Sequence, residues 1–122
     1  MIDGVKIIEL TTLEDERGFF REIFRFTEQF KELPVGQMSH SLVKEGVIKA
    51  WHGHIYQYQW NYVVSGQIQV YLYDNREDST TYRETMEFII GEVVKPCAYF
   101  FPPGVMHGYK CTQGPMKIIY LT

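Results

Sequence analysis

Three histidines stand where their side chains could take part in the same chemistry. His52 and His54 are two residues apart, and His107 follows the turn-forming run Pro102-Pro103-Gly104. Because a strand directs alternate side chains to opposite faces, a strand over residues 48–54 would place His52 and His54 on the same side. Imidazole serves near neutral pH as a general acid, a general base or a metal ligand. The spacing therefore predicts a reactive pocket.

The same alternation predicts which neighbours share that pocket. Ile48 and Ala50 would lie on the face of the two histidines, and the small Ala50 leaves room for a ligand, whereas Lys49, Trp51 and Gly53 would take the opposite face. A single histidine inside a barrel is more often packed than reactive. Three histidines supplied by two separate segments favour a functional site, because a site requires convergence.

A metal site is one alternative for these residues. Its ligands would be His52, His54, His107 and Gln59, a set in which the imidazoles suit Zn, Fe, Ni or Cu and an amide oxygen stands where a carboxylate is usual. The missing negative charge weakens the attraction for a divalent cation. We therefore expect no metal or other cofactor, with a metal-binding oxygenase or sensor as the alternative. Gln59 would otherwise hydrogen-bond to substrate or to a histidine.

Composition limits the other possibilities. A chain of 122 residues with 45% hydrophobic residues suits one domain over residues 1–122. The net charge of −3, with both signs interspersed, predicts neither nucleic-acid nor membrane-surface binding. No stretch reaches the roughly 20 apolar residues of a membrane span, and no signal sequence is evident. We expect a cytoplasmic protein in which Cys97 and Cys111 stay reduced.

Most of the chain predicts short strands separated by turn residues, the pattern of an all-β protein. In residues 67–73 apolar Ile68, Val70 and Leu72 alternate with polar and aromatic residues, and a polar loop follows over 74–79. At most one short helix is expected, over residues 27–33. This pattern favours a jelly roll, whose paired sheets leave few open edges. Further strands are expected over residues 88–90, 93–94, 99–101 and 117–121.

The histidine motifs resemble those of the cupin superfamily. The first motif contains Gly46, His52, His54, Gln59 and Gly66, and the second ends at His107. The resemblance implies a jelly-roll β-barrel that directs these side chains inward. Cupins usually carry Glu at the position of Gln59.

Three further blocks narrow the resemblance. Residues 15–22 are Asp-Glu-Arg-Gly-Phe-Phe-Arg-Glu, residues 37–41 are Gln-Met-Ser-His-Ser, and residues 46–52 are Gly-Val-Ile-Lys-Ala-Trp-His. In this order they resemble the dTDP-4-dehydrorhamnose 3,5-epimerase family, which carries Asp-x-Arg-Gly-Phe-Phe-x-Glu, Gln-Asp-Asn-His-Ser and Gly-Val-Leu-Arg-Gly-Leu-His. The resemblance runs from about Asp15 to the end of the chain.

This resemblance implies a metal-free isomerase that moves protons next to the ketone of a dTDP-4-keto-6-deoxyhexose. His52 would remove a proton, and Tyr120, which follows His107 at the family's spacing, would deliver one to the opposite face. Arg17 would bind the diphosphate through its planar fork of donors. Contacts to the rest of the substrate are expected from Phe20, Glu22, Gln37, Lys49, His54, Gln59 and His107.

The resemblance also implies a homodimer, for which outward Tyr71 and Tyr73 and the Tyr56/Tyr58 pair could form an aromatic contact surface.

Departures from the family keep two alternatives open. The His-x-His pair followed by Gln59 and Gly66 is similar to the dTDP-sugar 3,4-ketoisomerases, in which two histidines shuttle protons between adjacent carbons. The family's active-site Lys falls near Gln59, its Arg before the histidine is Lys49, and no residue up to Thr122 matches its C-terminal Asp, which we expect to be missing. Loss of the Lys weakens stabilisation of an oxyanion. A non-catalytic nucleotide-sugar-binding module is therefore the other alternative.

Overall fold

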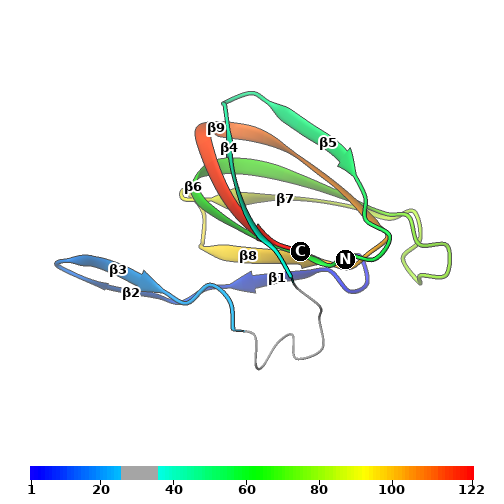
Figure 1. Cartoon of the computed structure of the whole chain (residues 1–122), viewed down its shortest axis with the longest axis horizontal. Helices are drawn as coiled ribbons and strands as arrows, with labels where there is room; N and C mark the ends of the chain where they lie inside the picture. The colour runs from blue at the N-terminus through cyan, green and yellow to red at the C-terminus, as the bar shows by residue number, and fades with distance from the viewer. Residues whose placement is uncertain (26–35) are drawn as a thin grey trace.

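The computed structural model describes residues 1–25 and 36–122, where it forms strands and no helix (Figure 1). The predicted helical turn at 27–33 falls largely within the stretch 26–35, outside the described residues. None of the described segments is a helix long and apolar enough to span a membrane. The strands are β1 (Lys6–Glu9), β2 (Thr12–Asp15), β3 (Gly18–Arg21), β4 (Met38–Val43), β5 (Ile48–His52), β6 (Gln59–Asp74), β7 (Thr85–Gly91), β8 (Cys97–Phe101) and β9 (Val105–Leu121).

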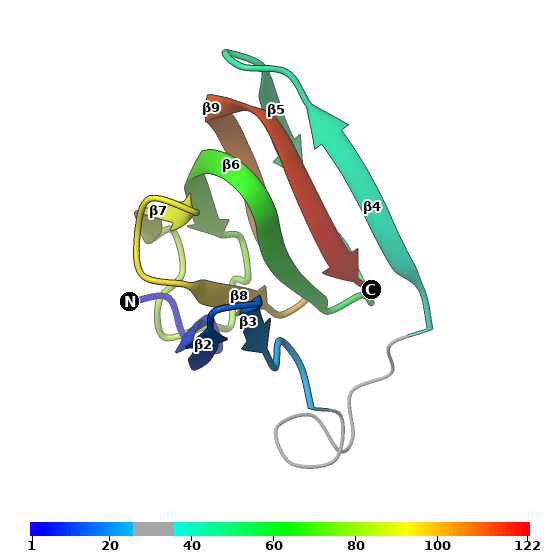
Figure 2. The same ribbon diagram turned by 90° about the vertical axis from the view of Figure 1, so that its left-hand side faces the viewer.

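Two long strands, β6 and β9, organise the fold because each contributes to two layers. The first part of β6 pairs with β8 and with the end of β9, which gives the order β1-β8-β6-β9-β4. The second part of β6 pairs with β7 and with the start of β9, whose other neighbour is β5. Figure 2 shows β6 and β9 curving from one layer into the other. The predicted all-β, jelly-roll class is confirmed.

The bend in β6 depends on Gly66. Its φ of +79° lies in the left-handed region, and a Cβ there would stand 2.5 Å from the carbonyl oxygen of Gln113. The pairing of β6 with β9 shifts register on both sides of this glycine, as expected at a bulge. A side chain at residue 66 would therefore oppose the bend that lets β6 serve both layers.

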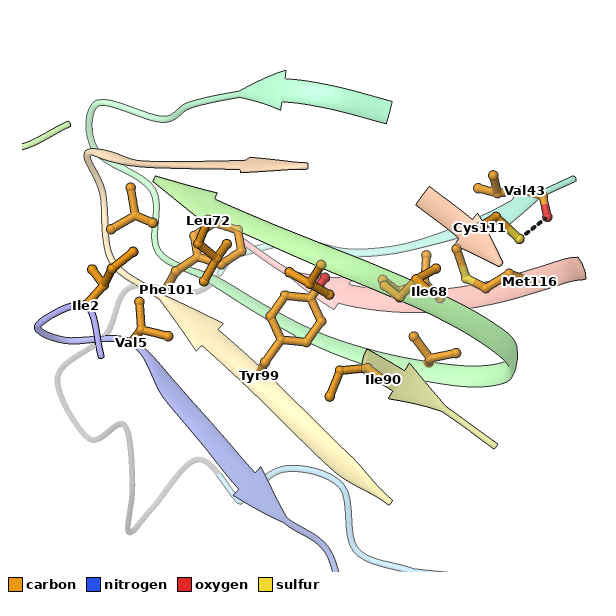
Figure 3. Packing of buried hydrophobic residues seen from close by; sticks show 14 residues of the cluster. Ile2, Val5, Val43, Ile68, Leu72, Ile90, Tyr99, Phe101, Cys111 and Met116 are labelled. Atoms are coloured by element: carbon orange, nitrogen blue, oxygen red, sulfur yellow. Dashed lines mark hydrogen bonds between the residues drawn. The ribbon is translucent and has the colours of Figure 1, made fainter. Parts of the chain in front are cut away.

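The hydrophobic core fills the space between the layers, as Figure 3 shows. Ile68, Val70 and Leu72 enter it from β6 with exposed fractions of 0–1%, which confirms the alternation predicted for residues 67–73. Tyr99 and Phe101 enter it from β8. Alternate residues of β6 and β8 point to the outer face of the first layer, where Trp60, Tyr62, Ala98, Phe100 and Leu121 form a second cluster.

Two of the local predictions are wrong. Residues 93 and 94 form a turn, not a strand, and Val93 is exposed because no neighbouring strand covers it. Asp74 is not part of an open polar loop but the fully buried last residue of β6. Its carboxylate accepts hydrogen bonds from the side chains of Arg76, Ser79 and Thr81, so it anchors the turn that follows.

Strands β2 and β3 form a separate hairpin that extends beyond the two layers (Figure 1). Large apolar side chains on it remain exposed, with fractions of 62% for Leu13, 61% for Phe19 and 66% for Phe20. Arg17 lies at its turn and is paired with Asp15. The hairpin therefore presents an apolar surface that the described part of this chain does not cover.

Candidate active site

A pocket of about 580 Å³ opens between the two layers, beside β4 and β5. This volume falls within the range of small-molecule sites. One wall comes from β5 and the start of β9, and the other from the start of β6, the end of β9 and a residue of β8. Six of the residues predicted to act on substrate line it: Lys49, His52, His54, Gln59, His107 and Tyr120.

The three histidines meet at one end of this pocket. His52 is the last residue of β5 and pairs with His107 of β9, with 5.9 Å between the ring centroids. The ring of His54 stacks on that of His107 at 5.3 Å. His54 lies beyond the end of β5, so the prediction that one strand carries both histidines is wrong. The chain leaves the strand after His52, but His54 still reaches the pocket.

The predicted division of faces along β5 also needs correction. Lys49 lines the pocket together with Ala50 and His52, because the pairing with β9 shifts register between Lys49 and His52. A bulge breaks the strict alternation of side chains. Trp51 does face away, toward a surface depression that it shares with Met106.

His107 is held in its neutral form. Burial is the main cause and the neighbouring His54 and His52 the next, and together they lower its pKa to about 4, because a positive charge there would be poorly solvated and would lie beside two other imidazoles. At neutral pH His107 therefore offers one donor and one acceptor nitrogen and carries no charge.

Two tyrosines line the pocket from β9. Tyr120 lies near the end of the strand, where Asn61 and Ser39 are its partners in the adjacent strands. Burial, with a smaller contribution from nearby Tyr120, raises the pKa of Tyr109 to about 12. Tyr109 thus keeps its proton throughout the neutral range and can donate a hydrogen bond.

A buried polar chain reaches one of the histidines. His54 Nε2 lies 3.1 Å from Gln59 Oε1, and Gln59 Nε2 donates to Asn61 Oδ1 over 2.8 Å. Asn61 in turn donates to the carbonyl oxygen of Tyr99. Asn61 is fully buried and Gln59 is 8% exposed, so water has little access to these groups.

Four predicted substrate contacts lie outside the pocket. Arg17 is at the hairpin turn, where its guanidinium bonds to Asp15 and its side chain is 83% exposed. Phe20 is on the same hairpin. Glu22 bonds to Arg25 near a different depression, beside β1. Gln37 precedes β4 and donates to Ser39 Oγ. Within one chain, none of the four faces the histidines.

Sequence reasoning missed four polar residues that line the pocket: Ser41, Asn61, Tyr99 and Tyr109. Two of them could have been predicted from their spacing in the sequence. Asn61 is two residues after Gln59, and Tyr109 is two residues after His107, so each shares a strand face with a residue already singled out. Tyr99 and Ser41 had no such signal, since they arrive from strands distant in sequence.

The metal alternative has no support in the geometry. In the two described stretches, no three or more His, Cys, Asp or Glu side chains converge closely enough to hold a metal ion. His54 directs Nε2 toward Gln59, and the imidazoles contact one another ring to ring. As they are arranged here, these side chains do not form a cluster of metal ligands.

The sequence over residues 1–122 matches the family model described as dTDP-4-dehydrorhamnose 3,5-epimerase. The chain belongs to this family. It is 45% identical over 123 residues to the spore coat polysaccharide biosynthesis protein SpsL of Bacillus subtilis, covering 100% of this chain and 80% of that protein. It is 30% identical over 128 residues to the dTDP-4-dehydrorhamnose 3,5-epimerase of Methanothermobacter thermautotrophicus, covering 92% of this chain and 69% of that one.

Among solved structures of the family, the chain is similar to the epimerase of Legionella pneumophila in complex with dTDP-4-keto-L-rhamnose. The TM-score is 0.88 at 26% identity, over 98% of this chain and 66% of that one. The family resemblance seen in the sequence motifs is thereby confirmed, and the chain is an epimerase-type isomerase. The roles of its individual residues remain predictions.

Proposed function

We propose that the chain inverts a carbon next to the keto group of a dTDP-4-keto-6-deoxyhexose, with His52 as base and Tyr120 as acid. The observation that carries the proposal is that these two side chains, from opposite layers, line one pocket large enough for a hexose. The ligand in the related Legionella structure supports the substrate class.

The reaction needs only these two groups and the ketone. An imidazole nitrogen of His52 takes the proton from the carbon, and the electron pair of the broken C–H bond moves onto the ketone oxygen to give an enolate. The phenol of Tyr120 then donates its proton to the opposite face of that carbon, which reverses the configuration. Solvent returns a proton to Tyr120 and accepts one from His52.

Several lining groups can stabilise the enolate. Among the described residues that line the pocket, Lys49 is the one Lys or Arg side chain, and its positive charge offsets the developing negative charge. Tyr109 keeps its proton and can donate to an oxyanion. No resident cofactor is required by this scheme.

Arg17 and Phe20 bear on the quaternary structure. They lie on the hairpin and do not line their own chain's pocket, so a role in substrate binding requires a second copy to present them. The exposed apolar side chains of the hairpin favour such an association. We propose a homodimer in which each hairpin serves the other chain. The free state of Cys97 and Cys111 supports a cytoplasmic location.

The 3,4-ketoisomerase reaction is a second candidate, favoured by the contact between His54 and Gln59 in the same pocket. In that reaction the proton returns to the neighbouring carbon and the keto group moves. Carbon NMR of the product separates the two reactions, since epimerisation leaves the keto group on the same carbon.

Incubation with a dTDP-4-keto-6-deoxyhexose in deuterated water tests the proposed function. Deuterium should enter next to the keto group with the wild-type protein and not with His52→Ala. Absence of deuterium from every such substrate offered would refute the proposal.

A further inference from the structure

The hydrogen-bonded chain behind His54 has a fixed direction. It begins at the backbone carbonyl oxygen of Tyr99, which can only accept, so the atom of Asn61 that faces it at 3.4 Å must be Nδ2. The oxygen of the Asn61 amide then faces Gln59, whose Nε2 donates to it over 2.8 Å.

The same reasoning shows which nitrogen of the His54 ring carries the proton. With Nε2 of Gln59 committed to Asn61, Oε1 of Gln59 faces His54 at 3.1 Å, and a carbonyl oxygen can only accept. Nε2 of His54 must therefore carry the proton. A neutral imidazole has one N–H, so the lone pair is on Nδ1.

Burial makes this direction hard to reverse. Turning over the amide of Asn61 would place two oxygens against each other at Tyr99 and two N–H groups against each other at Gln59. Both side chains are at least nine-tenths buried, so water is not available to satisfy groups left unpaired.

We propose that Asn61 and Gln59 are positioning residues that fix the neutral tautomer of His54, with the proton on Nε2 and the lone pair on Nδ1. The inference rests on the proposed function and deepens it. Nδ1 of His54 becomes a second acceptor in the pocket of His52, available to a hydroxyl group of the bound sugar. The role of Gln59 is thus to accept the hydrogen bond from His54 Nε2 and not to bind a metal.

Nitrogen NMR on the intact, histidine-labelled protein tests the tautomer without substrate. At a pH where His54 is neutral, wild type should show a protonated Nε2, an unprotonated Nδ1 and a slowly exchanging Nε2–H. Gln59→Glu loses the donor to Asn61 but keeps an oxygen that accepts from His54, so it should keep the proton on Nε2. Gln59→Lys offers only donors and should move the proton to Nδ1. Gln57→Leu, an exposed change outside the pocket, is the control and should match wild type.

A kinetic measurement on the same variants tests the consequence. Gln59→Lys should lower kcat/KM for deuterium incorporation at least about tenfold, while Gln59→Glu should restore it to within about threefold of wild type. An unprotonated Nε2 in wild type, or a Lys variant that folds and keeps its proton on Nε2, would overturn the inference. Should the Lys variant not fold, the wild-type spectrum still decides.

The NMR and kinetic measurements together distinguish a failure of this inference from a failure of the proposed function. The expected tautomer without any deuterium exchange in wild type would remove the proposed function and leave the positioning role intact. Deuterium exchange in wild type together with an unchanged tautomer in Gln59→Lys would remove the positioning role and leave the proposed function intact.

Discussion

His52 and Tyr120 belong to opposite layers of the sandwich and line the same pocket. His52 ends β5, and Tyr120 lies one residue before the end of β9. A sugar seated between the layers would therefore have the proposed base on one side and the proposed acid on the other, which is what inversion of a carbon requires.

Removing either group should therefore slow turnover strongly. We expect His52→Ala and Tyr120→Phe each to lower kcat by about 10²–10⁴-fold, the usual contribution of a positioned acid or base. The measurement is the rate at which the epimerised product forms from a dTDP-4-keto-6-deoxyhexose. His40→Ala and Tyr73→Phe are matched controls, because neither side chain lines this pocket, and both should stay near wild type.

Stability should depend on Asp74 far more than on Asp15. Both carboxylates pair with an Arg two residues later, but Asp74 is fully buried whereas Asp15 is exposed. We expect Asp74→Ala to lower the free energy of unfolding by about 3–5 kcal/mol, because it removes the buried carboxylate that accepts from Arg76, Ser79 and Thr81 and leaves the partly buried Arg76 without its partner. Asp15→Ala should cost about 0–1 kcal/mol. Urea unfolding of the two variants makes the comparison, and equal losses would contradict it.

The pH dependence of stability should reflect His107. Its folded-state pKa is about 4, against 6.5 for the unfolded chain, so the unfolded state binds more protons between these values. The contribution of neutral His107 to the free energy of unfolding is fully present above pH 6.5 and is lost as the pH falls toward 4. It amounts to at most about 3.5 kcal/mol, at about 1.4 kcal/mol per pKa unit.

Comparison of wild type with His107→Gln over this range isolates that contribution. The unfolding free energy of the variant should fall less steeply between pH 6.5 and pH 4. Asp74 does not titrate in this range and so does not affect the comparison. Burial raises its pKa, but the hydrogen bonds from Arg76, Thr81 and Ser79 have the larger effect and keep that pKa well below its ordinary value. Parallel curves for the two proteins would show that His107 is not held neutral.

Local patterns predicted the fold class and much of the pocket, since period-two alternation and the histidine spacing are properties of short segments. Ile68, Val70 and Leu72 illustrate the first, and His52 and His54 the second. The predictions that were wrong or missing depend on how strands far apart in the sequence pair with one another. The bulge that turns Lys49 into the pocket arises from the register of β5 against β9, and Tyr99 enters the pocket only because β8 pairs with β6. The placement of Arg17 likewise depends on where the hairpin lies.

Mixing two inactive variants should restore activity if the hairpin of one chain serves the pocket of another. In a heterodimer of Arg17→Ala and His52→Ala, one pocket combines a native His52 with a native Arg17 from the other chain. After unfolding and refolding the two together, about a quarter of wild-type activity should return, because half of the dimers are mixed and half of their pockets are complete. A mixture of His52→Ala and Tyr120→Phe is the control and should stay inactive, since both residues line the same chain's pocket. Activity no greater than the sum of the separate variants in the first mixture would place Arg17 outside the shared site.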